Sequence, residues 1–341
     1  MGKVVLFGEL MLRLKPEGKN RFFQTPGFEA VFGGSEANVA VSLSKLGKPV
    51  RYVTSLPDNA IGEAAESSLR YYGVEVNALK KEGRLGIYFL ETGACQRPSQ
   101  VIYDRAGSCF YLSEPDEYDW KNAFSDAEWF HVSGVSPAVS APACRSVMRA
   151  MDEAKKAGAL VSLDLNYRKK LWKYGKSADE VMTQLAEKAD VLIANEEDIQ
   201  NCLGIPLGNY ATPAESYRHL CESVKKSFPN VKIVAVTLRR SYSADRNGWG
   251  AVLHGESGFY ESAVYDIENI VERVGAGDSF AAGLIFALTN TDIKENKESY
   301  ALEFAAAASC LKHSINGDFN LASKSEVELL MKGNATGRIQ R

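Results

Sequence analysis

The stretch 129-WFHVSGVSPAVSAPACRSVMRAMDEAKKAGALVSLDLN-166 determines the fold that we expect for this chain of 341 residues. It contains two short apolar runs, WFHV and LVSL, that are typical of buried strands. Between them, residues 141–158 place apolar side chains at helical spacing. A strand, a helix and a second strand in this order predict a parallel pair joined by a helical crossover.

The same alternation continues along most of the chain. Further strand-like runs are 3–9, 50–56, 190–195 and 232–238, and further helix-like runs are 35–47, 60–73, 177–189 and 195–204. Apolar strands that alternate with amphipathic helices predict a mostly parallel sheet with helices on both faces. We therefore expect an α/β fold with three layers.

Two segments, 10–33 and 86–112, break this alternation. Both alternate apolar and polar residues at period two and are punctuated by Gly and Pro, a pattern typical of antiparallel strands. We expect them to pair as a small sheet beside a main domain that comprises 1–9, 34–85 and 113–335. A small sheet in that place predicts a lid.

The composition excludes several classes of function. With 45% hydrophobic residues, 24% charged residues and a net charge of −3, the chain has no electrostatic attraction for nucleic acid or an anionic membrane. No apolar run is long enough to span a bilayer. The six cysteines are scattered, which favours reduced thiols and a cytoplasmic location. The four histidines are isolated, so no zinc site is predicted.

The stretch 270-IVERVGAGDSFAAGLIF-286 carries the first chemical signal. Gly275, Ala276 and Gly277 leave the backbone bare, and the helix-like run that follows from 279 adds free N–H groups at its start. Such a turn favours binding of an anion, including a transferred phosphoryl group. Asp278 follows directly, and three roles are open for it: a helix N-cap (alone or with Ser279), a general base, or a metal ligand.

A second bare turn, Gly33-Gly34, precedes Ser35, Glu36 and Asn38 at another junction between strand and helix. Together the two turns resemble the signature regions of the PfkB (ribokinase-like) family of carbohydrate kinases. The resemblance spans nearly the whole chain, and the two inserted segments match the lid of that fold. It implies a ribokinase-like α/β/α domain that uses ATP, with Asp278 as the base and the N–H groups of 275–278 holding the phosphoryl group.

Six further segments look like one branch of that family, the 2-keto-3-deoxygluconate kinases, in which Arg precedes Val-Gly-x-Gly-Asp. This branch phosphorylates the C6 hydroxyl of 2-keto-3-deoxy-D-gluconate. Three positions depart from the wider family: Glu272 and Arg273 replace Asp and Thr, and Pro57 stands where Gly is usual. The segments are 86–108, 163–172, 195–198, 237–249, 271–280 and 312–320.

A sugar acid carries a carboxylate, which a cation must match when it is bound under a lid. Arg105 in a lid strand and Arg168 at the end of a main-domain strand are the candidate cations, and Tyr103 shares the face of Arg105. The alternative is that these arginines are solvated surface residues. The resemblance implies substrate contacts for Tyr103, Arg105 and Arg168, and also for Gly34, Asn38, Tyr88, Asp278 and Asp318; a plain turn residue is the alternative for Asp318.

Asn195 and Asp198 resemble the Asn-x-x-Glu motif of the family, which organises Mg²⁺ through water; Glu197 is the other candidate carboxylate. An acidic first helical turn is the alternative. The resemblance further implies a nucleotide site that includes a turn at Thr237-Leu238-Arg239. Its other predicted members are Asn166, Arg168, Asn195, Gly275 and Gly277. In helix 301–312, small residues suit either adenine binding or core packing.

Two other functions stay open. One is a kinase of the same fold that acts on fructose, ribose or a nucleoside, and the other is a sensor of sugar acids that has lost its chemistry. The presence of Asp278 favours a working kinase over a sensor. The partners that we expect are a small sugar acid and ATP, and the lid sheet is where a homo-oligomer would form.

Overall fold

The computed structural model describes residues 2–333. Met1 and residues 334–341, which include the two outer ends of the predicted main domain, lie outside the described residues.

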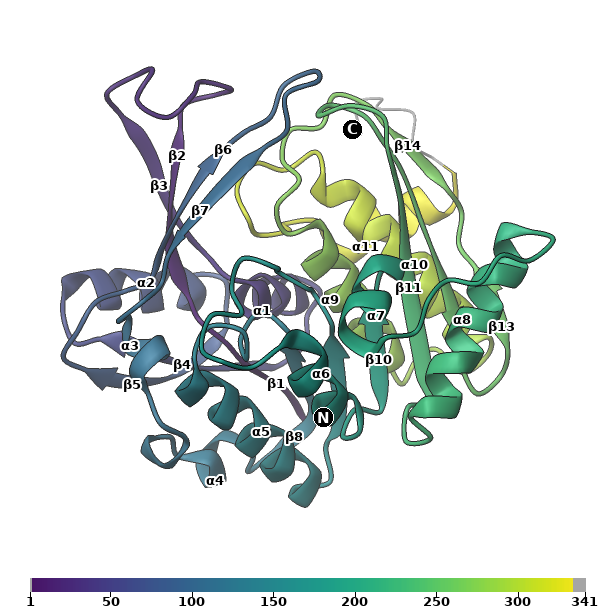
Figure 1. The fold of residues 1–341 in the computed structure, drawn as a ribbon, viewed down its shortest axis with the longest axis horizontal. Coiled ribbons are helices and arrows are strands. Elements are labelled where there is room, and N and C mark those ends of the chain that lie inside the picture. Colours follow the sequence, from purple (N-terminus) through teal and green to yellow (C-terminus); the bar gives the residue numbers. More distant parts are fainter. Residues whose placement is uncertain (1, 334–341) are drawn as a thin grey trace.

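The main domain is built on one large sheet, as predicted (Figure 1). Within residues 2–333 its strands run in the order β13 (Phe259–Glu261), β12 (Asn247–His254), β11 (Ile233–Ser241), β10 (Val191–Ala194), β9 (Leu160–Asp164), β8 (Ala127–Ser133), β1 (Lys3–Phe7), β4 (Val50–Pro57), β5 (Glu75–Lys81). Strand β14 (Tyr265–Ile267) pairs with β12. From β5 to β11 the pairs are parallel, and β12 begins an antiparallel edge.

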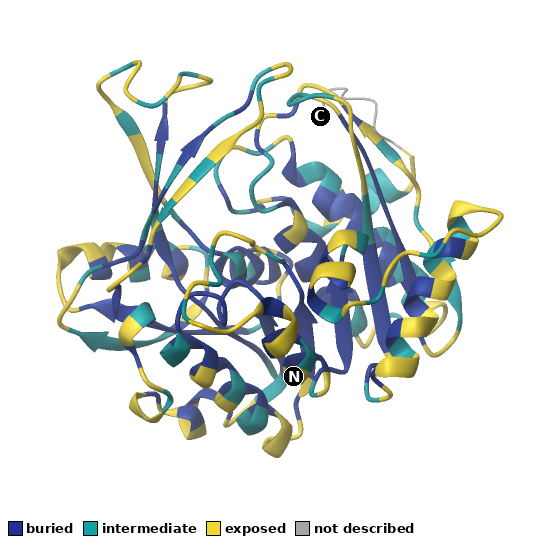
Figure 2. Ribbon diagram, in the orientation of Figure 1, coloured by how far each residue is buried: buried dark blue, intermediate teal, exposed yellow. Residues whose placement is uncertain are grey.

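Helices cover both faces of this sheet because successive strand residues point to opposite sides. Val4 and Leu6 belong to one apolar core, and Val5 and Phe7 belong to the other. The first core is covered by α1 (Ser35–Lys45), α2 (Ala60–Arg70), α9 (Ala276–Leu288), α10 (Lys297–Lys312) and α11 (Lys324–Met331). The second is covered by α3 (Cys109–Leu112), α4 (Trp120–Ala123), α5 (Ala141–Lys156), α6 (Ala178–Ala186), α7 (Glu196–Leu203) and α8 (Pro213–Ser227); a short 3-10 turn, η1, spans Pro115–Glu117. Figure 2 shows the strands between these layers as the most deeply buried part of the chain.

A second, smaller sheet stands apart from the first (Figure 1); it contains the segments that we expect to act as a lid, and we call it the lid sheet. Its order is β3 (Phe28–Gly33), β2 (Met11–Pro16), β6 (Ile87–Glu91), β7 (Gln100–Asp104). Two expectations were wrong. The central pair β2–β6 is parallel, because the two strands come from separate insertions rather than one hairpin. Residues 109–112 form helix α3, which packs Phe110 against Phe7 of the main core.

No helix within residues 2–333 combines the length and the apolar character needed to cross a membrane.

Candidate active site

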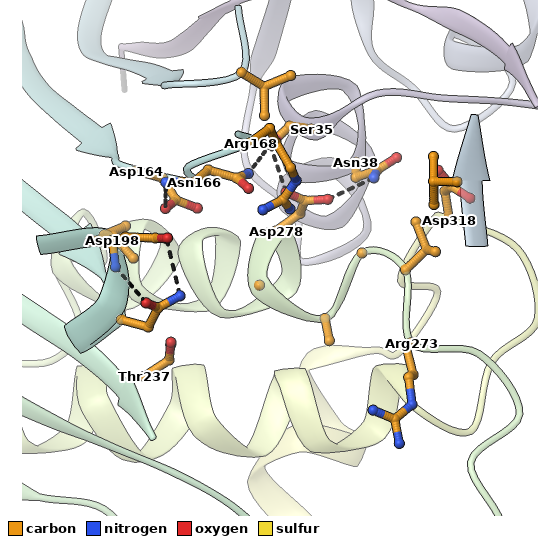
Figure 3. A pocket seen from close by; sticks show the side chains of 18 of the residues that line it. Ser35, Asn38, Asp164, Asn166, Arg168, Asp198, Thr237, Arg273, Asp278 and Asp318 are labelled. Atoms are coloured by element: carbon orange, nitrogen blue, oxygen red, sulfur yellow. Dashed lines mark hydrogen bonds between the residues drawn. The ribbon is translucent and has the colours of Figure 1, made fainter. Parts of the chain in front are cut away.

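A cavity of about 430 Å³ lies between the lid sheet, the carboxyl ends of the parallel strands and the first turns of α1 and α9 (Figure 3). The carboxyl end of a parallel sheet is where α/β folds bind ligands. The structure brings all the predicted site residues to this one cavity, although the sequence separates them widely. They are Gly34, Asn38, Tyr88, Tyr103, Arg105, Asn166, Arg168, Asn195, Asp198, Thr237, Arg239, Gly275, Ala276, Gly277, Asp278 and Asp318.

The glycine turn, Gly275–Gly277, opens helix α9. Gly275 is its N-cap residue with φ +85°, a conformation that favours glycine, and a Cβ there would lie 2.1 Å from the carbonyl oxygen of Asp318. A Cβ on Gly277 would meet no other group within 4 Å, so its backbone is open to the cavity. The free N–H groups of this first turn therefore face the space where an anion would bind.

The helix starts earlier than we predicted, and the capping role proposed for Asp278 or Ser279 is wrong. Ala276 is already helical, which makes Asp278 the third residue of α9. The N-cap Gly275 has no side chain to cap with, and the hydroxyl of Ser279 donates to the Gly275 carbonyl oxygen at 2.8 Å. The carboxylate of Asp278 is thus available for another purpose.

Asp278 points to the start of helix α1 (Figure 3). The hydroxyl of Ser35 donates to Oδ1 and the amide of Asn38 donates to Oδ2, each at 2.7 Å. Burial raises the pKa of Asp278 to about 6, while the donors Asn38 and Ser35 act in the opposite direction. A carboxylate with this pKa is ionised near neutral pH and can still accept a proton, as a general base must.

Asn166, which we predicted, and Ser35 and Asp164, which we did not, hold this arrangement in place. The amide of Asn166 donates to the Ser35 hydroxyl at 3.0 Å, and the backbone N–H of Asn166 donates to Asp164 Oδ1 at 3.1 Å. Burial, and then the charges of Asp198 and Asp278, raise the pKa of Asp164 well above its usual range. Ser35 and Asp164 were missed as site residues, although the run of Asp164, Asn166 and Arg168 after a strand was a usable signal.

Asn195 and Asp198 lie at the start of helix α7, on the far side of the cavity from the lid. Asn195 caps the helix by accepting from the Asp198 N–H at 2.8 Å, and its amide lies 3.1 Å from Asp198 Oδ2. Glu196, Glu197 and Asp198 do form an acidic first helical turn, and the cation role of this turn stays a prediction. Asp198 is buried, with its pKa raised to about 6 by burial, whereas Glu197 is exposed. Asp198 is thus the better-placed carboxylate for a cation.

Arg105 is buried, with 5% of its surface exposed, so the alternative of a solvated surface residue is wrong. Its Nε donates to Glu9 Oε2 at 2.5 Å, and the hydroxyl of Ser108 donates to the other Glu9 oxygen at 2.5 Å. The Nη1 atom of Arg105 is buried and has no hydrogen-bond partner among the described residues. The ring of Tyr103 lies 5.9 Å from the guanidinium carbon. Glu9, which we did not predict, therefore orients Arg105, a residue that lines the cavity.

Asp318 faces the lid sheet. Arg13 of β2 donates to Oδ1 and the hydroxyl of Tyr88 donates to Oδ2, while the other arm of Arg13 pairs with Glu272. The Asp318 side chain is 2% exposed, so a plain turn residue is the wrong description. Both of its oxygens are occupied within the protein, so Asp318 links the lid to the main domain.

Two expectations concern the nucleotide side of the cavity. Thr237 and Arg239 do not form a turn, because β11 continues to Ser241 through its pairing with β12. In α10 small residues do pack in the core, since a Cβ on Gly283 of α9 would lie 2.8 Å from the Ala305 Cα; adenine binding by this helix stays a prediction.

Three arginines give the cavity a basic rim. Arg168 is exposed and donates to the carbonyl oxygen of its neighbour Tyr167 at 3.0 Å. Burial lowers the pKa of Arg273, and the nearby charge of Arg239 lowers it further. A rim of this kind favours a ligand with several negative charges.

Comparisons with known proteins identify the family of this chain. The model of the pfkB family carbohydrate kinases matches residues 1–318. A 2-dehydro-3-deoxygalactonokinase from Haloferax volcanii is 32% identical over 98% of both chains, and a probable fructokinase-2 from Arabidopsis thaliana is 28% identical over 91% of this chain and 89% of its own. The crystal structure of a 2-dehydro-3-deoxygluconokinase from Thermotoga maritima has a TM-score of 0.90 and 43% identity, and the match covers 98% of this chain and 100% of that one. The α/β fold with its separate lid sheet is thus ribokinase-like, and the chain belongs to the pfkB family of carbohydrate kinases.

Proposed function

We propose that the protein transfers the terminal phosphoryl group of ATP to the C6 hydroxyl of 2-keto-3-deoxy-D-gluconate, which gives the 6-phosphate. The observation that carries this proposal is the pairing of two features in one cavity. Asp278 supplies a buried carboxylate beside the glycine turn, and Arg105 supplies a buried, unpartnered Nη1 below the lid. A sugar acid has a hydroxyl for the first group and a carboxylate for the second.

The acid end of the substrate is recognised by Arg105. A carboxylate that leaves water for a closed site needs a charged, directed donor, and arginine provides one in fixed geometry. Glu9 holds Nε and so fixes the guanidinium at the cavity wall, where Nη1 has no hydrogen-bond partner among the described residues. Tyr103 lies beside the guanidinium, at the cavity wall.

The phosphoryl transfer itself is carried out at α9. Asp278 accepts the proton of the attacking hydroxyl, and the donors Ser35 and Asn38 hold the carboxylate in position. The N–H groups of the glycine turn stabilise the charge on the transferred group. The lid excludes water, which limits loss of the phosphoryl group to hydrolysis.

The nucleotide lies toward the basic rim, with Arg168, Arg239 and Asn166 as phosphate or ribose contacts and Thr237 and Asn195 beside them. Burial raises the pKa of both Asp164 and Asp198 there, and the charge of Asp198 raises that of Asp164 further, which is a setting that favours a cation. Asp198 and Asp164 would hold Mg²⁺, mostly through water. Bound Mg²⁺ would neutralise phosphate charge during transfer.

A neutral sugar such as fructose is the second candidate substrate. Glu9 already pairs with Arg105, so part of the guanidinium charge is neutralised without a sugar acid. One relative is a 2-dehydro-3-deoxygalactonokinase and another is a probable fructokinase. Fructose and 2-keto-3-deoxygalactonate are therefore the most informative alternative substrates.

A coupled assay of ADP release tests the proposal. The wild-type protein is supplied with ATP, Mg²⁺ and, in turn, 2-keto-3-deoxygluconate, its galactonate epimer, fructose, ribose and adenosine. We expect the highest kcat/KM with a 2-keto-3-deoxy sugar acid, and phosphorus NMR of the product places the phosphate on C6. A preference for fructose, ribose or adenosine would contradict the sugar-acid assignment, and no turnover with any of them would favour the sensor.

We also propose that the protein forms a homo-oligomer through the lid sheet. Three apolar side chains of the lid insertions, Phe23, Val31 and Ile102, are exposed by 81%, 39% and 48%. Light scattering after size-exclusion chromatography tests this proposal, with Phe23→Ser and Ile102→Ser expected to shift the protein toward the monomer.

A further inference from the structure

A buried lysine outside the cavity has no role in the chemistry described so far. Lys312, the last residue of α10, has no exposed surface. Its Nζ donates to the carbonyl oxygen of Ile315 at 3.0 Å. Holding an ammonium group away from water is costly, so a residue that only filled space here would be better as Met or Leu.

Lys312 lies directly behind the glycine turn. A Cβ on Gly275 would come within 3.2 Å of the Lys312 Cε, and within 2.1 Å of the Asp318 carbonyl oxygen. Two further contacts hold the turn and the segment before it: the Ser309 hydroxyl of α10 donates to the Ala276 carbonyl oxygen at 2.7 Å, and the Val271 N–H donates at 2.9 Å to the carbonyl oxygen of His313, the C-cap of α10. The end of α10 therefore sets the position of the phosphoryl-binding backbone.

Lys312 also acts on the turn through electrostatic interactions. Glu272 and Asp318 are buried carboxylates that share a single direct cation, Arg13 of the lid. Glu272 also accepts from the N–H groups of Arg273 and Val274, at 3.0 and 3.3 Å, and so shapes the residues that lead into the turn. With Lys312 the charge cluster of Arg13, Glu272, Lys312 and Asp318 is neutral. Without Lys312 one negative charge would be left beside the place where the phosphoryl group arrives.

We propose that Lys312 is a positioning residue for phosphoryl transfer: its ammonium group is a fixed internal cation that balances Glu272 and Asp318 and holds the glycine turn in its anion-binding form. The inference rests on the proposed kinase chemistry but is independent of which sugar is used.

The titration of Lys312 supports this role. Burial lowers its pKa to about 8, against the opposing effects of Glu272 and Asp318; Arg13 lowers it further and Asp278 raises it. The ammonium is therefore charged at neutral pH and loses its proton as the pH rises through about 8. Turnover in the wild-type enzyme is expected to fall in that range.

The test compares Lys312→Met with Lys48→Met. Lys48 is a matched control because it is also buried, with 5% exposed surface, and also donates to a backbone carbonyl oxygen, that of Thr289, at 2.8 Å at the other end of α9. Both variants are expected to lower the unfolding temperature. Only Lys312→Met is expected to lower kcat by tenfold or more with little change in the KM of the sugar, and to lose the alkaline limb of the pH profile.

A chemical rescue separates charge from packing. Lys312→Ala opens a space beside the Ile315 carbonyl oxygen that a small monovalent cation can fill. We expect NH₄Cl or KCl to restore part of the lost kcat, while tetramethylammonium chloride at the same ionic strength does not; Lys312→Arg should retain more activity than Lys312→Met.

Two results would overturn the proposal: a kcat for Lys312→Met no lower than that for Lys48→Met, or a wild-type profile that stays flat from pH 7 to pH 9.5. The second needs no variant, so a misfolded variant does not end the test. All rates are measured with whichever sugar the wild type phosphorylates best. Wild-type activity on fructose alone would therefore overturn the sugar-acid assignment and leave this comparison intact.

Discussion

The amide of Asn38 lies 2.7 Å from Asp278 Oδ2, which joins the first helix after the lid insertion to the helix that begins at the glycine turn. Asn38 favours the ionised carboxylate, whereas burial of Asp278 favours the neutral acid. Burial is the larger effect, so the pKa is raised to about 6. At neutral pH the Asp278 carboxylate is thus ionised, although its ionisation lowers the stability of the folded protein.

Replacing Asp278 by Asn is expected to lower kcat by about three orders of magnitude, because a general base contributes roughly 10²- to 10⁴-fold. Binding of the sugar, measured by calorimetry, should change little. An unchanged kcat would end the assignment of Asp278 as the base.

The same substitution is expected to stabilise the fold. A carboxyl whose folded pKa is raised from 3.8 to about 6 weakens the fold as the pH rises through that window, by up to about 3 kcal/mol above pH 6. Asp278→Asn removes this penalty. Its unfolding temperature should exceed that of the wild type at pH 7.5, and the difference should shrink toward pH 4. A difference that does not depend on pH would contradict this account.

The pH dependence of kcat/KM provides a second prediction. Activity should fall as the pH drops through about 6, because Asp278 becomes protonated and cannot accept the hydroxyl proton. Asn38→Ala removes a group that lowers this pKa, so the acid limb should move to higher pH. Asn201→Ala is the control: Asn201 is exposed and donates to the Glu197 carbonyl oxygen at 2.7 Å, away from Asp278. If the acid limb of the kcat/KM profile lies at the same pH in both variants, the proposed role of Asn38 is contradicted.

The fold was largely predictable because it follows local patterns, whereas most members of the site were predictable through the family resemblance. Apolar runs at strand and helix spacing predicted the parallel sheet, and bare turns after strands predicted the cavity at its carboxyl edge. Family resemblance added the branch and most of the site residues.

The partners of those residues were not predictable, since they depend on contacts between distant parts of the chain. Glu9 meets Arg105 across 96 positions, and Arg13 meets Asp318 across 305. No spacing rule links such pairs. The helix start at Ala276 was missed for a different reason: Gly has a low helix propensity, yet the first turn of a helix tolerates it where bare backbone is needed.

Arg105 is predicted to set substrate preference. Arg105→Ala should lower kcat/KM for the sugar acid by about 100-fold, since a lost charged hydrogen bond in a closed site costs roughly 1.5 to 3 kcal/mol, while a neutral sugar should be affected much less. Competition assays with fructose measure the ratio. Glu9→Gln should weaken the preference to a smaller extent, because Nε then loses a charged partner.

Arg97→Ala is the control for Arg105. Arg97 is also a lid arginine paired with a carboxylate, that of Glu91, at 2.5 Å, but it does not line the cavity. Equal changes of substrate preference in the two arginine variants would show that the effect comes from a loosened lid rather than from recognition of a carboxylate.

Asp245 is predicted to keep the lid closed over the site. It accepts from the Cys95 N–H at 2.8 Å and from Lys19, both in the lid insertions, and the neighbouring Ala244 N–H donates to the Cys95 carbonyl oxygen at 2.7 Å. On its other side, Arg273 donates to the Ala244 carbonyl oxygen at 3.0 Å, next to the glycine turn.

Asp245→Ala should therefore loosen the lid at a point that contacts the site. We expect a higher KM for the sugar and a several-fold rise in ATP hydrolysis relative to sugar phosphorylation, because water enters an open site. Arg246→Ala serves as the control, since Arg246 pairs with Asp266 on the exposed edge of the main sheet. If Asp245→Ala hydrolyses no more ATP per phosphorylated sugar than Arg246→Ala does, then Asp245 does not keep the lid closed during turnover.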